Sequence, residues 1–497
     1  MRSVWTRRRF LYALGSTALG IVSPVRLRVS EEKTKQPNVL FIALDDLNDW
    51  IKVLDANAPI QTPNIERLAK RGTLFTKAYC ASAACNPSRT AILTGLRPTT
   101  SGVYGNKTDW RKALPEAVTL PQHFMAHGYR AEGAGKIFHH HYSGAFHDKA
   151  SFDDFLMMPD PPDAPMPEKK LNGLVKYGSR NTDWGPWPAN EAEAIDVKTA
   201  NYVIKSPKKK HDKPFFLAAG IFRPHMPFFA PQRYFNIYPR DDITMPKIFE
   251  KDIDDLPSGA RTLLKTKKWF FRELMEIETK SPGAWKEAVR AYQASATFAD
   301  AQVGRILDAL DNSDYHNNTI IVLWSDHGYH LGEKEHWEKF ALWEKTNHVP
   351  FIIVAPGVTP PGTRCERPVS LIDIYPTLID LCGLGQKPEL DGVSLVPLLK
   401  NPNANWARPA VMTYMRGNHA VRDRRWRYIR YADGTEELYD HQKDPHEWYN
   451  VAADPGNSRV INRLQQWLPA TEAPSYSWIL PSIPNGSGRW GKLTSTC

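Results

Sequence analysis

The sequence predicts an α/β protein: a large, mainly parallel β-sheet flanked by helices, then a smaller C-terminal α+β domain containing an antiparallel sheet. Short apolar runs alternate with helix-like segments, which is typical of a parallel sheet covered by helices. Near Arg408 the sequence changes character, and Tyr, Arg and Trp become frequent. A chain of 497 residues is also longer than one hydrophobic core usually supports, so we expect two domains.

Four apolar runs are predicted to be buried strands of the main sheet. Each is short and almost free of polar residues, and each is followed by polar or turn-forming residues, as expected of a strand covered on both faces. The runs are "NVLFIAL" at 38–44, "PFFLAAG" at 214–220, "TIIVLWS" at 319–325 and "PFIIVAPG" at 350–357.

Amphipathic segments between these runs are predicted to be helices. Thr119 is a candidate N-cap for "LPQHFMA", and Gly128 is a stop signal. Longer helical patterns cover 285–310 and 370–384, whereas 143–190, rich in Pro, Asp and Gly, is expected to be an insertion loop over the main domain.

The C-terminal segment is predicted to form an antiparallel sheet. Its short alternating stretches are interrupted by an Asp433-Gly434 turn signal. We therefore predict a main, catalytic domain at 36–404 and a smaller domain at 405–497.

The N-terminus is predicted to be an export signal, at about residues 1–30. "TRRRFL" resembles the bacterial twin-arginine signal and precedes an apolar run too short to span a membrane. Export to the periplasm or the extracellular space of a bacterium is expected, without stable membrane insertion; the alternative is a disordered basic tail.

The net charge does not indicate nucleic-acid binding. Six arginines and no acidic residue lie in the first 28 residues, so subtracting six from the formal +10 leaves +4 for the rest of the chain. The remaining basic runs are typical of solvated loops, and no nucleic-acid-binding motif is present.

Polar residues follow three of the predicted strands. Asp45 and Asp46 come after the first strand, Asp326 and His327 after "TIIVLWS", and His225 after "PFFLAAGIFRP". The carboxyl ends of parallel strands meet at one edge of a sheet, where ligands bind. Either Asp pair alone is as well explained by a strand-end cap or a turn, but together they indicate hard oxygen ligands for Ca²⁺ or Mg²⁺.

Cys85 lies in "ACNPSRTAILTG", where a helix is expected to begin at Ser88. The positive end of that helix and the charge of Arg89 favour an anion at Cys85 and lower the pKa of its thiol. The alternative is an ordinary buried cysteine.

The stretch Cys85-Asn86-Pro87-Ser88-Arg89 with "TAILTG" resembles the signature of type I sulfatases, of the alkaline phosphatase superfamily. In that family a formylglycine-generating enzyme recognises C-x-P-S-R and oxidises the Cys to formylglycine, an aldehyde. The resemblance implies the alkaline phosphatase-like fold and a sulfuric ester hydrolase, with the formylglycine-generating enzyme as a partner.

Other segments extend the resemblance. "GKIFHH" implies catalytic Lys136 and His139, although the register also allows His140 or His141. "RPHMPF" implies His225, and "SDHGYHLGEKEHWEKF" implies Asp326, His327 and Lys339. Many members of the family have Asn where this chain has His327. A His at this position resembles the iduronate 2-sulfatase subgroup, as do "GKIFHH", "RPHMPF" and "HWEKF".

The resemblance also implies a mechanism. Residue 85, as a hydrated formylglycine, attacks sulfur, while one Ca²⁺ lowers the pKa of the attacking oxygen. The other implied roles are as follows: Asp45, Asp46, Asp326, His327 and residue 85 hold the metal, Lys136 and Lys339 stabilise the sulfate oxygens, Arg89 holds the diol, His225 protonates the departing sugar oxygen, and His139 deprotonates the second hydroxyl to expel sulfate.

The predicted substrate is a sulfated oligo- or polysaccharide, of which a 2-O-sulfated uronic acid is one candidate. Trp110, Arg111, His419 and Arg422 either line a saccharide pocket or pack between domains. Two other functions are considered: a formylglycine-dependent phosphodiester or phosphonate monoester hydrolase, and a non-catalytic carbohydrate-binding protein on the same fold.

Overall fold

The computed structural model confirms the predicted fold class. It describes residues 36–139, 148–159, 166–174 and 182–476, apart from the side chains of 266–270. The predicted export signal at 1–30 and the alternative histidines His140 and His141 lie outside the described residues.

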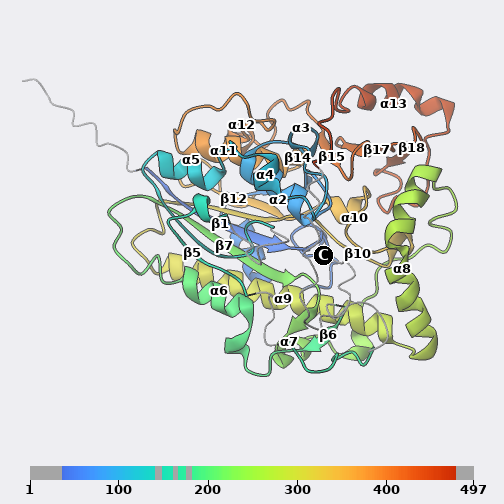
Figure 1. The fold of residues 1–497 in the computed structure, drawn as a ribbon, viewed down its shortest axis with the longest axis horizontal. Helices are drawn as coiled ribbons and strands as arrows, with labels where there is room; N and C mark the ends of the chain where they lie inside the picture. The colour runs from blue at the N-terminus through green and yellow to red at the C-terminus, as the bar shows by residue number, and fades with distance from the viewer. Residues whose placement is uncertain (1–35, 140–147, 160–165, 175–181, 477–497) are drawn as a thin grey trace, which may run out of the picture. The chain divides into compact units, whose positions relative to one another are not determined.

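The core of the fold is an eight-stranded sheet with β1 near its middle (Figure 1). Along β1, Val39, Phe41 and Ala43 pack into one hydrophobic cluster, whereas Leu40 and Ile42 pack into another on the opposite face. This alternation explains why the strand is a continuous apolar run. The strand order is β13 (Thr363–Cys365), β2 (Thr73–Phe75), β12 (Phe351–Val354), β9 (Thr319–Ser325), β1 (Asn38–Asp45), β7 (Phe215–Pro224), β4 (Arg130–Gly135) and β5 (Asp154–Leu156).

The sheet is parallel from β9 to β5 and mixed at the other edge. β12, one of the four predicted strands, runs antiparallel to both β9 and β2. The strands β9, β1, β7, β4 and β5 run parallel to one another, so their carboxyl ends meet at one edge.

Helices cover both faces of this sheet (Figure 1). One face carries α2 (Cys85–Thr94), α5 (Leu120–Ala126), α11 (Ile374–Leu381) and α12 (Val396–Lys400). The other face carries α1 (Pro63–Ala69), α6 (Ile195–Val203) and α9 (Ala284–Asp311). The remaining α-helices are α3 (Pro98–Ser101), α4 (Trp110–Ala113), α7 (Gln232–Phe235), α8 (Ser258–Lys280), α10 (Glu344–Asn347) and α13 (Ser458–Gln465).

The helix boundaries confirm one expectation and correct another. Thr119 caps α5 in a capping box with Gln122. Helix α2, however, begins at Cys85 and not at Ser88. Pro87 is tolerated inside its first turn because the amide hydrogen that proline lacks has no helical partner there.

The predicted antiparallel sheet of the C-terminal segment is present. Gly434 adopts φ +84° in the turn between its last two strands, and the boundary at 404/405 stays a prediction. The sheet consists of β15 (Ala410–Thr413), β16 (His419–Arg422), β17 (Trp426–Arg430) and β18 (Glu436–Asp440).

The segment predicted as an insertion loop, 143–190, is more ordered than expected in its described parts. Residues Asp154–Leu156 form β5, the edge strand of the main sheet, and β6 pairs with β8. The small two-stranded sheets are β6 (Trp184–Pro186) with β8 (Phe228–Ala230), β3 (Ala78–Tyr79) with β14 (Val369–Ser370), and β10 (His330–Leu331) with β11 (Trp337–Glu338).

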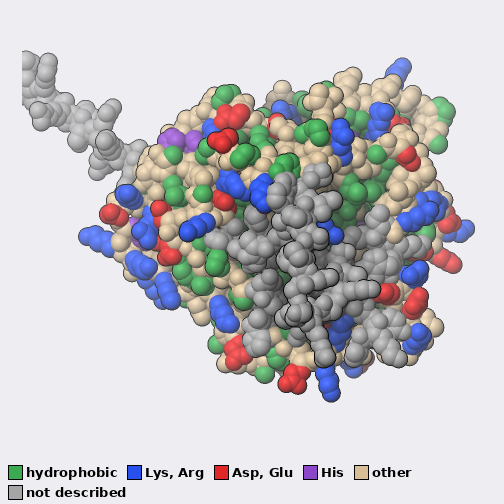
Figure 2. All heavy atoms as spheres, viewed as in Figure 1, with side chains coloured by type: hydrophobic (Ala, Val, Ile, Leu, Met, Phe, Trp, Pro, Cys, Tyr) green, Lys and Arg blue, Asp and Glu red, His purple; other side chains and the backbone are tan. Residues whose placement is uncertain are grey.

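The described surface mixes positive, negative and apolar side chains (Figure 2). Among the described residues, no helix has the length and apolar character that crossing a membrane requires.

Candidate active site

The site residues lie where neighbouring parallel strands end. Asp45 is the last residue of β1, Asp326 follows β9, Lys136 follows β4, and His225 follows β7. The strand order β9-β1-β7-β4 places all four at one edge of the sheet. The structure therefore brings these residues together at one edge of the sheet, as the sequence analysis predicts.

Two glycines let Lys136 enter the site. Gly135 has φ +79°, and a Cβ there would lie 2.0 Å from the carbonyl oxygen of Gly220. A Cβ on Gly220 would lie 2.3 Å from the backbone of Lys136. The ends of β4 and β7 approach this closely because both residues lack side chains.

Cys85 is fully buried at the first position of α2 and faces positive charge. Its Sγ lies 3.3 Å from Lys339 Nζ and 3.2 Å from His327 Nε2. Burial raises the pKa of this thiol, but the charges of Lys136, Lys339 and His327 outweigh burial and hold the pKa well below its usual value. The site therefore stabilises an anion at position 85.

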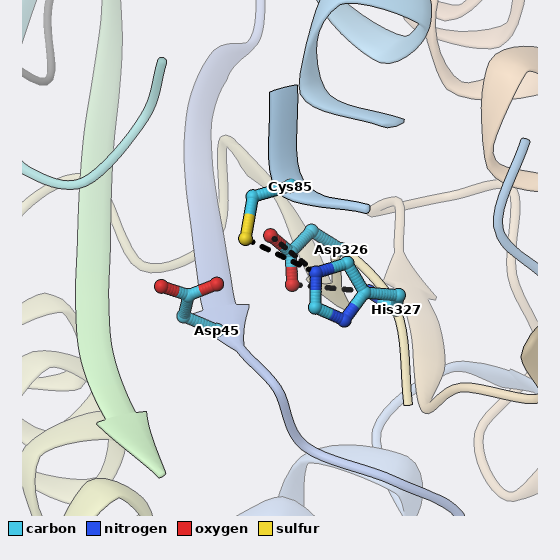
Figure 3. A group of neighbouring side chains, drawn as sticks. All are labelled: Asp45, Cys85, Asp326 and His327. Carbon is cyan, nitrogen blue, oxygen red and sulfur yellow. Dashed lines mark hydrogen bonds and ion pairs between the residues drawn. The ribbon is translucent and has the colours of Figure 1, made fainter. Parts of the chain in front are cut away.

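Four side chains converge into a possible metal site (Figure 3). One ligand atom each from Asp45, Cys85, Asp326 and His327 lies within 4.8 Å of the others. Asp46 belongs to a second such group, with Cys85 and His225. Two carboxylates provide the hard oxygen donors that Ca²⁺ and Mg²⁺ prefer.

Two details of these ligands fit a cation. Asp45 Oδ1 is buried and accepts no hydrogen bond from any described residue. The Nδ1 atom of His327 lies 3.1 Å from the carbonyl oxygen of Gly328, which can only accept, so Nδ1 carries the hydrogen. The lone pair of Nε2 then faces the group in neutral His327, an arrangement common in metal-binding histidines.

Arg89 compensates the two ligand carboxylates. Its Nε donates to Asp326 Oδ2 at 2.8 Å, and one of its terminal nitrogens lies 3.5 Å from Asp45 Oδ1. It also donates to the carbonyl oxygens of Lys136 and, at 3.2 Å, Ile137. Arg89 has no exposed surface, so it ties α2 to β1, β9 and the residues after β4.

Two lysines bind the adjacent acid pair. Lys136 Nζ pairs with Asp45, and Lys339 Nζ donates to both oxygens of Asp46 at 2.9 and 3.1 Å. Burial raises the pKa of Asp45, but Lys136 outweighs it and holds the pKa below the usual range. The pKa of Asp326, in contrast, is raised to about 7, because burial exceeds the opposing effect of Arg89.

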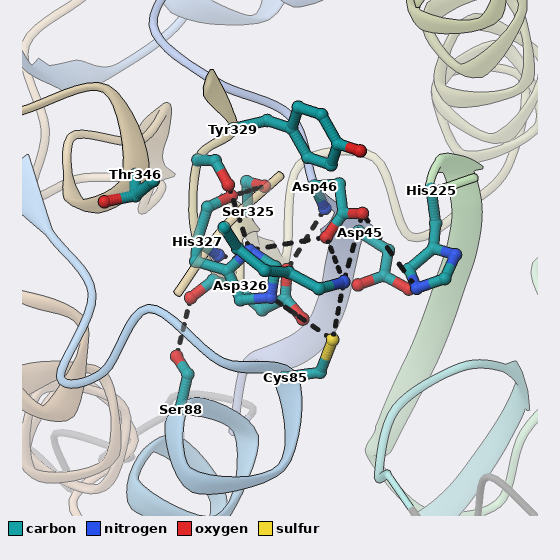
Figure 4. A network of polar contacts seen from close by, with 12 residues as sticks. Asp45, Asp46, Cys85, Ser88, His225, Ser325, Asp326, His327, Tyr329 and Thr346 are labelled. Carbon is teal, nitrogen blue, oxygen red and sulfur yellow. Dashed lines mark hydrogen bonds and ion pairs between the residues drawn. The ribbon is translucent and has the colours of Figure 1, made fainter. Parts of the chain in front are cut away.

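His225 presents one ring nitrogen to the site (Figure 4). Its Nδ1 donates to the carbonyl oxygen of Met226 at 2.5 Å, so Nε2 faces Asp46, 3.9 Å from Oδ2. Burial and Lys339 lower the pKa of His225, but Asp46 and Asp45 raise it further, to about 10.

His139, the register chosen from the sequence, lies in the site. Its side chain is 3% exposed and interacts with Cys85. Burial lowers its pKa to about 4, so His139 is neutral at pH 7.

No sequence pattern identifies the residues that orient the acid pair. Asp46 has a left-handed φ of +68°, and Tyr292 of α9 holds it by donating to its carbonyl oxygen at 2.8 Å. Ser325 Oγ accepts from Leu47 N at 3.0 Å and donates to the carbonyl oxygen of His327 at 3.0 Å (Figure 4). One hydroxyl thus joins both ligand-bearing turns.

The four residues suggested for a saccharide pocket are packing or pairing residues instead, and all but the partly exposed Arg111 are buried. Trp110 is 0% exposed and stacks on Phe138, with the ring centroids 5.1 Å apart. Arg111 pairs with Asp148, Arg422 with Glu344, and His419 with Glu472. Their aromatic and basic character serves packing and ion pairing, the alternative that the sequence left open.

Comparison with known proteins agrees with this geometry. The family model "Sulfatase" matches residues 37–384, and the model "N-sulphoglucosamine sulphohydrolase, C-terminal" matches 332–473. A "Sulfatase" of Formosa agariphila is 39% identical over 484 residues, covering 94% of this chain and 93% of the relative. Human iduronate 2-sulfatase is 30% identical over 397 residues, covering 71% of this chain and 70% of the relative.

Solved structures share the fold. A phosphonate monoester hydrolase from Silicibacter pomeroyi superposes with a TM-score of 0.71 at 22% identity, covering 87% of this chain and 94% of that one. The chain belongs to the sulfatase family, and it is an enzyme of that class.

Replacing Arg89 tests the charge compensation. We expect Arg89→Ala to lower the free energy of unfolding by about 3 kcal/mol or more, because it leaves the carboxylates of Asp45 and Asp326 buried without their guanidinium. Urea denaturation followed by fluorescence measures this.

Arg233→Ala is the control for that experiment. Arg233 forms a two-point pair with Glu191 at 2.7 Å, but its side chain is 66% exposed, so a loss below about 1 kcal/mol is expected. Equal losses in the two variants would contradict the compensating role of Arg89.

Proposed function

We propose that this enzyme removes sulfate from a sulfated saccharide, with residue 85 as the nucleophile after conversion of Cys85 to formylglycine. The observation that carries the proposal is the position of Cys85. Cys85 is the first residue of α2, and its Sγ contacts Lys339 and His327. It lies beside the carboxylates of Asp45 and Asp326, which can hold a cation.

The charge balance supports an anionic substrate. The carboxylates of Asp45, Asp46 and Asp326 are balanced by Arg89, Lys136 and Lys339, and protonated His225 adds a further positive charge. A divalent cation bound among them would make the site strongly positive. That charge matches a sulfate ester together with an anionic nucleophile.

Two groups would complete the chemistry. Formylglycine at position 85, once hydrated, supplies the attacking oxygen and a second hydroxyl for the later release of sulfate. Asp45, Asp46, Asp326 and His327 would hold Ca²⁺, which would supply Lewis acidity favouring the anionic form of that oxygen.

The protein side chains bind the sulfate and move the protons. Lys136 and Lys339 place their ammonium groups beside position 85, where they bind sulfate oxygens as charge develops in the transition state. Arg89 fixes α2 against the metal ligands and so holds residue 85 in place.

Two histidines divide the proton transfers. His225 directs Nε2 into the site, where its proton goes to the departing sugar oxygen. His139 lies against residue 85 and is neutral, so it takes the proton of the second hydroxyl when sulfate leaves.

Formylglycine-dependent phosphonate monoester or phosphodiester hydrolysis is the second candidate function, favoured by the phosphonate monoester hydrolase fold neighbour. Relatives named sulfatase and iduronate 2-sulfatase weigh toward sulfate and toward a sulfated uronic acid. A purely carbohydrate-binding role is disfavoured by the convergence of nucleophile, acid and base. Export by the N-terminal segment remains part of this proposal.

The modification of Cys85 is the deciding test. In protein made with a formylglycine-generating enzyme, we expect the peptide 78–89 to show the mass change for replacement of CH₂SH by CHO. Release of sulfate from aryl and sugar sulfates is expected to exceed release of phosphate from matching esters. Cys85→Ala is expected to lower kcat at least about 10³-fold.

Cys80→Ala is the matched control. Cys80 is also fully buried, but its Sγ lies 3.5 Å from Asn347 Oδ1 and outside the metal group. Turnover should change less than about threefold, since no reacting group is lost. An unmodified Cys85 in active protein, or preferred turnover of the phosphate esters, would refute the proposal.

Metal binding gives a readout that does not depend on activity. Chelator-treated protein is expected to bind one Ca²⁺ in calorimetry, and Asp45→Asn to weaken binding at least about 10-fold because a charged ligand is lost. Asp49→Asn is the control, since Asp49 already pairs with Lys345 at 2.8 Å and His348 at 3.1 Å. Equal weakening by both variants would exclude the assigned ligands.

The role of His225 predicts a dependence on the leaving group. His225→Ala is expected to lower kcat/KM about 10²- to 10⁴-fold for a sugar sulfate and far less for 4-nitrocatechol sulfate, whose phenolate leaves without protonation. His123→Ala, at a buried histidine bonded to the carbonyl oxygen of Leu384, is the control. A uniform loss on both esters would exclude His225 as the acid.

A further inference from the structure

A cavity of about 560 Å³ lies beside the start of α2. Its walls come from segments far apart in the chain: the loop 102–108, the start of α8, and the turn between β15 and β16. Its size falls within the roughly 300–1,000 Å³ range of small-molecule sites. Nothing in the chemistry proposed above uses it.

The first wall is bonded directly to the residue after the nucleophile. Asn86 Nδ2 donates to the carbonyl oxygens of Gly105 at 3.0 Å and Thr108 at 2.7 Å. The backbone amide of Asn86 donates to Asn106 Oδ1 at 3.0 Å. The loop that lines the cavity is therefore held against the first turn of α2, where Cys85 begins the helix.

The second wall is connected to a catalytic lysine. The turn at Met415 follows Tyr414, whose ring lies 5.7 Å from the ring of Phe340. Phe340 follows Lys339, and its amide donates to the carbonyl oxygen of Ala83, two residues before Cys85. Both walls are thus linked by direct contacts to residues next to Cys85 and Lys339.

The third wall is the first turn of α8, which packs closely on the C-terminal sheet. A Cβ on Gly259 would lie 2.3 Å from Tyr431 Cβ, so this position requires glycine. The close approach leaves Thr262 and Leu263 lining the cavity.

The lining suits a sugar ring. Leu263 and Met415, which is 44% exposed, supply apolar surface for the C–H face of a pyranose. Arg416 adds a guanidinium that is 52% exposed. Its partners are Glu472, through a 3.5 Å ion pair and a 3.4 Å hydrogen bond to the carbonyl oxygen, and the hydroxyl of Tyr104; an ion pair with a side chain this exposed contributes little energy. An incoming carboxylate or sulfate can therefore bind this guanidinium.

We propose that this cavity is a sugar subsite that takes a pyranose ring of the anionic saccharide bearing the sulfate ester, with Arg416 as the determinant for a carboxylate or second sulfate on that saccharide. This proposal rests on the proposed sulfatase function and specifies its substrate. An enzyme with this subsite recognises a sugar ring of its substrate in addition to the sulfate ester.

Filling the cavity tests the subsite. We expect Thr262→Trp to lower the ratio of kcat/KM for sulfated uronate-containing disaccharides to kcat/KM for 4-nitrocatechol sulfate at least tenfold, mainly through KM. Arg416→Ala is expected to lower the same ratio only for disaccharides that carry a carboxylate or second sulfate. A ratio unchanged in both variants would overturn the proposal.

Thr279→Trp is the matched control, since Thr279 is an exposed threonine on the same helix, outside the cavity lining. The ratio of kcat/KM for the disaccharides to kcat/KM for 4-nitrocatechol sulfate should be the same in Thr279→Trp as in the wild type. If this ratio falls as far as in Thr262→Trp, the cavity is not the sugar subsite.

Direct binding separates this proposal from the sulfatase function. In the Cys85→Ala variant, calorimetry with the same disaccharides measures affinity without turnover. A tenfold weaker affinity on adding Thr262→Trp supports the subsite even if the wild type hydrolyses no sulfate ester. Equal affinity with and without Thr262→Trp overturns the subsite even if sulfatase activity is confirmed.

Discussion

The compensation of buried charge is the constraint on which the site depends. Asp45, Asp46 and Asp326 are almost completely excluded from water, and burying a carboxylate is costly unless it is paired. Arg89, Lys136 and Lys339 supply the partners, each from a different segment of the chain. The same cations favour an anion at Cys85, so the interactions that make the site stable also prepare it to bind a negatively charged ester.

Parallel strand order explains how such a site forms. The strands β9, β1, β7 and β4 are neighbours, and each is followed by polar residues that cannot enter the apolar layers. Residues 280 positions apart in the chain therefore meet, as in the bond from Asp46 N to Asp326 Oδ1. Tyr292 and Ser325 then fix the orientation of the turns, so the ligand geometry depends on the packing of α9 as well as on the sheet.

The proposed reaction centre and the cavity beside it serve different requirements. The centre is densely charged and fully buried, which suits recognition of a compact anion. The cavity combines apolar surface with a few polar groups, which suits a sugar ring. Asn86, inside the C-x-P-S-R sequence, links the two because its side chain holds the cavity loop. This residue therefore has a structural role in the folded enzyme in addition to its place in the signature.

The sequence by itself determined the α/β class, the central strands and the residues brought together at the strand ends, because continuous apolar runs and strand-end polar residues are local patterns. The family resemblance implied His139, which lies in the site, whereas the alternatives His140 and His141 lie outside the described residues. The sequence misjudged the start of α2, since Pro87 is compatible with a first helical turn, and it left open whether Trp110 and Arg422 bind sugar or pack. Only the tertiary structure decided those points, the pairing of each lysine with its aspartate, and the cavity between α8 and the β15–β16 turn. All of these depend on contacts between segments distant in sequence, which no local pattern encodes.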